Sequence, residues 1–171
     1  MVISMKSLTQ SAKKNLVILI MLTMFGVLMY VSQVVMASLP NIEIVSLLII
    51  LVTRKFGVKA FWSVYIFVGL EILTYGISIW VVNYLYVWAI LVLLVLCFRK
   101  IDNAYFYAII SSVYGLFFGT FCSVPYFITG GIPMGISYII GGIGYDLAHC
   151  IGNFALLIIL YKPLKKVIDK I

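Results

Sequence analysis

The chain has 171 residues, of which 65% are hydrophobic and only 10% are charged, and its mean hydropathy is +1.23. A typical soluble domain is about half apolar and about a quarter charged, so this composition excludes a soluble kinase, nuclease or dinucleotide-binding domain. At about 20 residues for each membrane-spanning helix, the chain has room for about five to seven spans and for no separate soluble domain.

The first apolar segment predicts a membrane-spanning helix over residues 15–37. It follows a basic segment, residues 1–14, and contains 23 residues without a charge. A cleaved signal peptide has a shorter apolar core that ends in small residues, so we expect this helix to be retained. Leu39-Pro40-Asn41 ends it, because proline cannot continue a helix.

Five further helices are predicted in chain order. The second is short, and Glu43 lies near its start. A break at Val81–Asn83 separates the third helix from the fourth, and Thr129–Pro133 ends the fifth. The five predicted helices cover residues 42–52, 58–80, 84–98, 104–127 and 135–161. We therefore expect an all-α integral membrane protein with six transmembrane helices in residues 15–161 and a basic tail, residues 162–171.

The basic residues predict the orientation of these helices in the membrane. All 12 lysines and arginines lie before the first predicted helix, between the second helix and the first turn of the third, after the fourth or after the sixth. The alternate connections carry none. Short cytoplasmic loops are enriched in Lys and Arg, so both termini are predicted to be cytoplasmic. We interpret the net charge of +7 as this orientation signal and expect no nucleic-acid partner.

Small residues recur along three of the predicted helices. Such stripes allow helix backbones to approach closely in lipid. They are typical of packing seams within a bundle, and a partner's helix docked on the same stripe is the alternative. The residues concerned are Thr23 and Gly26 in the first helix, Ser111, Gly115, Gly119 and Ser123 in the fifth, and Gly144, Ala148 and Gly152 in the sixth.

Ionisable groups inside membrane spans are costly and mark candidate functional sites. Glu43 begins the second predicted helix, and Glu71 lies about 20 Å along the third. Asp146, His149 and Asn153 follow an i, i+3, i+7 spacing, so they share one face of the sixth helix. A structural lock within the bundle, contact with a ligand and a proton relay are all compatible with this spacing.

A candidate binding site combines these groups with polar and aromatic residues in the outer halves of the helices. Trp and Tyr also form belts at membrane interfaces, which is the alternative interpretation for each ring. As a set they suit a flat heteroaromatic ligand, and carboxylates without a nearby cation favour a neutral or cationic ligand, such as a thiamine- or pyridoxine-like compound, over a polyanion. The candidates are Asn41, Glu43, Glu71, Tyr75, Asn83, Tyr84, Trp88, Tyr126, Tyr138, Asp146 and His149.

Several catalytic motifs are missing from the sequence. It contains no G-x-x-x-x-G-K-[ST], so ATP hydrolysis by the P-loop route is excluded. It also lacks G-x-S-x-G, H-E-x-x-H and C-x-x-C, and its three cysteines are far apart. We expect no catalytic residue, no metal site and no cofactor.

Three parts of the chain resemble one known family. They are residues 39–48; residues 115–119 with Ser123-Val124-Pro125-Tyr126; and residues 144–154 before Lys162-Pro163-Leu164. Together they are similar to the substrate-binding S components of energy-coupling factor (ECF) transporters, small six-helix membrane proteins of bacteria and archaea. The resemblance covers nearly the whole chain.

The resemblance implies a transport subunit in the cell membrane of a prokaryote. Such a subunit binds a vitamin or related micronutrient in an outward-facing pocket and topples in the membrane when it joins a coupling subunit and two cytoplasmic ATPases. The family's usual Ala-x-x-x-Ala motif is missing from the first helix, which has Thr23 and Gly26. A membrane-embedded enzyme and a non-transport scaffold are the alternative functions.

Overall fold

The computed structural model describes residues 5–39 and 41–170, and the regular structure within them is helical. The all-α class predicted from the sequence is therefore confirmed. The elements are α1 (Met5–Val35), α2 (Val45–Phe56), the short 3-10 helix η1 (Gly57–Lys59), α3 (Ala60–Tyr75), α4 (Ile79–Cys97), α5 (Ala104–Leu116), α6 (Phe118–Cys122) and α7 (Val124–Lys170).

Long apolar helices dominate the part of the chain that the structure describes. Four segments of it are long and apolar enough to cross a membrane: Gln10–Val35, Val45–Tyr75, Ile79–Cys97 and Val124–Lys170. The apolar helix α5 is shorter. This architecture is that of a membrane protein, in agreement with the composition.

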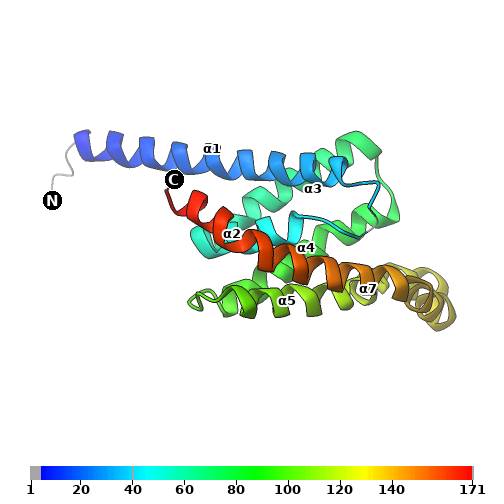
Figure 1. Ribbon diagram of the computed structural model, residues 1–171. Helices are drawn as coiled ribbons and strands as arrows, with labels where there is room; N and C mark the ends of the chain where they lie inside the picture. Colours follow the sequence, from blue (N-terminus) through cyan, green and yellow to red (C-terminus); the bar gives the residue numbers. More distant parts are fainter. Residues whose placement is uncertain (1–4, 40, 171) are drawn as a thin grey trace.

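The helices form a bundle with α2 at its centre. Every residue from Val45 to Thr53 is buried, which explains how a helix too short to cross a bilayer alone can be apolar on all sides. α1 lies along one side of the bundle, and α5 and α7 lie on another (Figure 1). The first turns of α1 and the last turns of α7 are at the same end of the molecule (Figure 1).

Close backbone contact joins α1 to α3. A Cβ atom at Gly26 would lie 2.6 Å from the Ser63 carbonyl oxygen, so only glycine allows this approach. The Ser63 hydroxyl donates a hydrogen bond to the Leu22 carbonyl (2.7 Å), and Trp62 Nε1 donates to Thr23 Oγ1 (3.2 Å). Thr23 and Gly26 therefore lie in a seam within the bundle.

A second seam joins α5 and α6 to α7. A Cβ atom at Gly115 would lie 2.9 Å from the backbone of His149, and one at Gly119 would lie 2.5 Å from Asp146 Oδ2. Ser111 is buried, and its carbonyl accepts a hydrogen bond from Asn153 Nδ2 (3.1 Å).

The other small residues of the predicted stripes lie in different surroundings. A Cβ atom at Gly152 would meet Ile42 at 3.3 Å, outside the α5–α7 seam. The Ser123 hydroxyl donates to the nearby Thr120 carbonyl (2.7 Å). Gly144 faces open space, since a Cβ atom there would have no neighbour within 4 Å, and Ala148 is half-buried.

The connection between α3 and α4 differs from the prediction. α3 ends at Tyr75 rather than Trp80, and α4 begins at Ile79, so the break lies at residues 76–78 and not at Val81–Asn83. Gly76 has a φ of 77°, and its N–H donates to the Ile72 carbonyl (2.9 Å), which terminates α3. Glycine adopts this left-handed conformation without steric cost.

The fifth and sixth predicted helices are also divided differently. Residues 104–127 are interrupted at Phe117 and again at Ser123. The predicted break at Thr129–Pro133 lies inside α7, where Gly131 alone is non-helical (φ 67°). Pro40, part of the other predicted break, lies outside the described residues.

α7 does not end at Tyr161, as predicted, but passes Pro163 and continues to Lys170. Contacts with other elements hold this last segment in place. Lys55 Nζ donates to the Ile168 carbonyl (3.0 Å), and Lys165 Nζ lies 3.0 Å from Asp102 Oδ2. These contacts connect the residues after Pro163 to α2 and to the α4–α5 connection.

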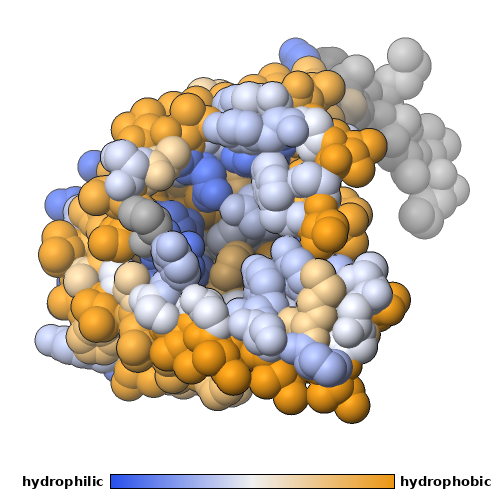
Figure 2. Space-filling view, turned by 90° about the vertical axis from the view of Figure 1, so that its right-hand side faces the viewer, coloured by the Kyte–Doolittle hydropathy of each residue, from blue (hydrophilic) through white to orange (hydrophobic). Residues whose placement is uncertain are grey.

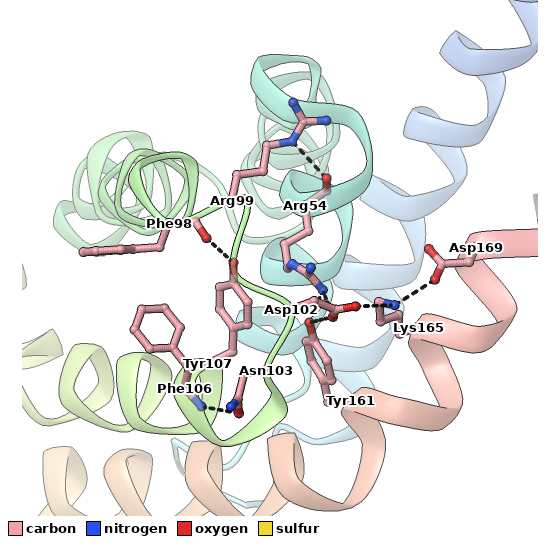
Figure 3. Close-up of polar contacts among 10 residues, drawn as sticks. All are labelled: Arg54, Phe98, Arg99, Asp102, Asn103, Phe106, Tyr107, Tyr161, Lys165 and Asp169. Carbon is pink, nitrogen blue, oxygen red and sulfur yellow. Dashed lines mark hydrogen bonds and ion pairs between the residues drawn. The ribbon is translucent and has the colours of Figure 1, made fainter.

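Ionic contacts connect α2, the α4–α5 connection and the last turns of α7 (Figure 3). Arg54 Nη1 lies 2.9 Å from Asp102 Oδ1 and also donates to the Tyr161 hydroxyl. Arg99 Nε donates to the Arg54 carbonyl (2.9 Å). The hydrogen bond from Lys165 and the charge of Arg54 lower the pKa of Asp102, although partial burial opposes them.

Candidate ligand-binding cavity

A cavity of about 400 Å³ lies at the opposite end of the bundle. Figure 2 shows this end as a hollow with hydrophilic walls, surrounded by hydrophobic surface. Its walls come from the end of α1, the segment before α2, the end of α3, the first half of α4, and single residues of α6 and α7. They are Gln33, Met36, Ala37, Leu39, Asn41, Ile42, Glu43, Glu71, Tyr75, Trp80, Tyr84, Trp88, Phe118 and His149.

The fold brings most of the predicted site residues to this cavity. These residues come from separate parts of the chain, and only tertiary packing places them together. The predicted residues that line the cavity are Asn41, Glu43, Glu71, Tyr75, Tyr84, Trp88 and His149. Asn83, Tyr126, Tyr138 and Asp146 do not line it.

Those four residues make contacts within the protein. Asn83 lies inside α4, because this helix begins earlier than predicted. Its Oδ1 accepts a hydrogen bond from the Tyr86 hydroxyl (2.9 Å). Tyr126 and Tyr138 stack on each other across the Gly131 kink, with ring centroids 4.1 Å apart. Asp146 Oδ1 accepts a hydrogen bond from the Gly119 N–H (2.9 Å).

Glu43 is held by hydrogen-bond donors of the protein itself. Its carboxylate accepts from the Ser46 N–H (3.1 and 3.2 Å) and from the Ser46 hydroxyl (2.6 Å). His149 Nε2 lies 3.1 Å from Glu43 Oε1. The first of these bonds satisfies a free N–H at the start of α2, where a negative charge is favourable. Glu43 therefore anchors α2 and α7 at the cavity floor.

The shared face of Asp146, His149 and Asn153 contacts several different parts of the fold. Asp146 accepts a hydrogen bond from Gly119 on α6, and His149 contacts Glu43 in the segment before α2. Asn153 Nδ2 donates to the Ser111 carbonyl on α5 and lies 3.4 Å from the Ser46 hydroxyl on α2. This face of α7 thus joins several elements, and of the three residues only His149 also lines the cavity.

Glu71 differs from the other carboxylates of this half of the bundle. Glu71 is only 2% exposed, and its Oε1 has no hydrogen-bond partner among the described residues. Three other buried atoms of the cavity lining also have no described partner: Gln33 Oε1, Trp88 Nε1 and His149 Nδ1. Buried polar atoms in native proteins are normally paired, so these atoms are suited to contact a ligand.

Aromatic rings form a continuous wall along α4. Trp80, Tyr84 and Trp88 follow an i, i+4, i+8 spacing, and neighbouring ring centroids lie 5.2 and 5.4 Å apart in edge-to-face arrangements. Tyr75 extends the row at one end (5.8 Å), and Phe118 extends it at the other (5.4 Å). The wall offers a large apolar surface to a flat ligand.

Some lining residues were not among the predicted candidates. Gln33 Nε2 donates to the Tyr84 hydroxyl (2.7 Å) and so connects α1 to the aromatic wall. The signal for Gln33 was an amide near the end of a mostly apolar helix. For Trp80 the signal was its spacing from Tyr84 and Trp88, whereas Phe118 carries no signal that separates it from other core phenylalanines.

The cavity has the chemistry of a binding site. It offers one carboxylate oxygen, Glu71 Oε1, that has no partner among the described residues, together with a few converging polar atoms and a wall of aromatic rings. No group of three or more His, Cys, Asp or Glu placed to hold a metal occurs in the part of the chain that the structure describes. Comparison with known protein families, curated proteins and solved structures gave no match.

Proposed function

We propose that this protein is the substrate-binding subunit of an ECF-type importer in the cell membrane of a prokaryote. It captures a vitamin or related micronutrient from outside the cell. The observation that carries the proposal is the position of the cavity (Figure 2) at the end of the bundle opposite Arg54, Arg99 and Lys165 (Figure 3). Under the positive-inside rule, that cavity opens on the outer face.

The size and lining of the cavity support capture of a small molecule. Ligand sites in proteins have volumes of about 300–1,000 Å³ and combine apolar walls with a few polar groups. The cavity is about 400 Å³ and includes five aromatic residues in its lining. A flat heteroaromatic ligand of vitamin size is compatible with both properties.

Six transmembrane helices are part of this proposal. The apolar segment Val45–Tyr75 is divided by η1, where Gly57 has a φ of 64°. Because Arg54, Lys55 and Lys59 surround this turn, we assign α2 and α3 as two separate spans. With α1, α4, α5–α6 and α7 after its kink, this assignment gives six spans and two cytoplasmic termini.

In this proposal the energy for uptake comes from other subunits, since the sequence contains no P-loop motif for ATP hydrolysis. The proposed partners are a transmembrane coupling subunit and two cytoplasmic ATPases. The test is purification in mild detergent followed by native mass spectrometry. We expect a bound small molecule and a complex with the ATPases. Accumulation of a ligand against its gradient by this protein alone, in liposomes without ATP, would contradict the proposal.

Two Trp→Ala substitutions, one in the cavity and one outside it, test whether the captured ligand binds in the cavity. Trp80→Ala removes a ring of the cavity wall, and Trp62→Ala removes an exposed ring from the α1–α3 side. Loss of one aromatic contact weakens binding by roughly two- to tenfold. Trp80→Ala is expected to reduce ligand retention to this extent, and Trp62→Ala is expected to leave it unchanged. Equal retention in the two variants would place the ligand elsewhere.

A further inference from the structure

The carboxylates near the cavity differ in how their charge is balanced. Glu43 accepts hydrogen bonds from Ser46 and lies against His149, and Asp146 accepts a bond from the Gly119 N–H. Both groups are therefore satisfied by the protein. Glu71 is equally buried, yet its Oε1 has no described partner. Of these three groups, Glu71 alone is left to interact with whatever enters the cavity.

A buried carboxylate is strongly unfavourable unless a cation or several hydrogen-bond donors accompany it. No lysine or arginine occurs among the described residues that line the cavity. The aromatic wall cannot balance a negative charge, but aromatic faces attract cations. The side chains around Glu71 thus favour a positive group that arrives with the ligand.

Two further atoms define the other contacts of such a ligand. Trp88 Nε1–H is a buried donor without a described partner, so it suits a hydrogen-bond acceptor. His149 Nε2 faces the Glu43 carboxylate at 3.1 Å, and because a carboxylate only accepts, this nitrogen is the donor. The other ring nitrogen, His149 Nδ1, is buried without a described partner and suits a second polar group on the ligand.

We infer that the ligand is an organic cation: a planar ring bearing an ammonium or amidinium group whose N–H atoms bond the Glu71 carboxylate. The ring lies along the α4 wall beside Trp88, and the charged group points at Glu71 on α3. This inference rests on the proposed function only in requiring that the cavity binds a small molecule. It names Glu71 as the residue that selects for charge.

Three probes of one shape test the inference. Benzylamine, benzyl alcohol and benzoate share a ring and differ in being cationic, neutral and anionic at neutral pH. Binding to the purified full-length protein is measured by calorimetry and by quenching of tryptophan emission, since Trp80 and Trp88 line the cavity. Titrations into empty detergent micelles are subtracted. The parent is expected to bind benzylamine roughly tenfold or more tighter than benzyl alcohol, as for a hydrogen bond to a charged group.

Two variants assign this preference to one carboxylate. Glu71→Gln keeps the shape and removes the charge, and it is expected to bind the amine and the alcohol within about threefold of each other. Asp169→Asn removes one charge at the opposite end of the bundle, where its side chain is 51% exposed, and should retain the full preference. Calorimetric unfolding of each variant verifies that it is folded.

The outcomes separate this inference from the proposed transport function. Benzyl alcohol or benzoate binding as tightly as benzylamine would overturn the inference, as would an amine preference that survives Glu71→Gln or absence of binding by all three probes. A complex with the ATPases in native mass spectrometry would still support transport in each of these cases. Conversely, an amine preference without any ATPase complex would support the inference and contradict the transport function.

Discussion

His149 Nε2 on α7 lies 3.1 Å from Glu43 Oε1, although the two residues are 106 positions apart in the sequence. Glu43 also accepts the Ser46 N–H at the start of α2. One carboxylate therefore joins the central helix of the bundle to the long C-terminal helix. Because both residues line the cavity, the same contact shapes its floor.

We predict that Glu43→Ala lowers the free energy of unfolding by about 2 kcal/mol, because it leaves a buried donor at the start of α2 and the ring of His149 without their partner. His149→Ala should lower it as well. The double variant is expected to be less destabilised than the sum of the two, by about 1 kcal/mol. Reversible unfolding in mixed micelles measures all three values. Strict additivity would show that the two residues do not interact.

Gly119→Ala is predicted to destabilise the protein by about 1–3 kcal/mol, the usual cost of overpacking. The added Cβ would lie 2.5 Å from Asp146 Oδ2 in the α6–α7 seam. Gly144→Ala is the matched control, since nothing lies within 4 Å of its Cβ position. It should be neutral or stabilise α7 by about 0.5–1 kcal/mol through helix propensity. Thermal unfolding compares the stability of the two variants. Equal unfolding midpoints would contradict the close packing of Gly119 against α7.

The lowered pKa of Asp102, caused first by its bond from Lys165, predicts a pH dependence of stability. The contribution of this contact is complete above the unfolded-state pKa of about 3.9 and is lost as the pH falls through the lower folded-state pKa. The side chain is 56% exposed, so solvent screening limits the contribution to less than about 1 kcal/mol.

Asp102→Asn should therefore be less stable than the parent at neutral pH by less than about 1 kcal/mol, with the two proteins converging in acid. Unfolding curves recorded over a pH series measure this difference. High salt should reduce it, because a partly exposed ion pair is screened. A difference that grows toward acid would have the wrong sign and would exclude this role for Asp102.

The proposed topology predicts one-sided labelling of introduced cysteines. In a variant without Cys97, Cys122 and Cys150, Ile77→Cys should react with a membrane-impermeant maleimide from outside the cell. Lys100→Cys should react only after the membrane is opened. Both positions are exposed and lie at connections between helices, Ile77 between α3 and α4 and Lys100 between α4 and α5. The reverse labelling pattern would show that the orientation is inverted and that the cavity faces the cytoplasm.

Local properties of the chain determined its all-α fold class and the approximate positions of many of its helices. An apolar segment such as residues 15–37 is helical wherever it lies in lipid, because every backbone N–H must find a partner within the segment. The grouping of the basic residues is likewise a property of sequence order, and in the fold Arg54, Arg99 and Lys165 do lie at one end. The break near Thr129–Pro133 also followed from local chemistry, since Gly131 has a positive φ.

Only the tertiary structure decided where α7 ends and which carboxylate is left for a ligand. α7 passes Pro163, and its last turns are bonded by Lys55 and Asp102 from other elements. Glu43, Glu71 and Asp146 are equivalent as sequence features, but Glu43 is paired across 106 positions and Asp146 across 27. Helix periodicity specifies the face on which a side chain lies and not the neighbour it meets. That neighbour depends on how the helices pack, and packing left Glu71 Oε1 without a hydrogen-bond partner among the described residues.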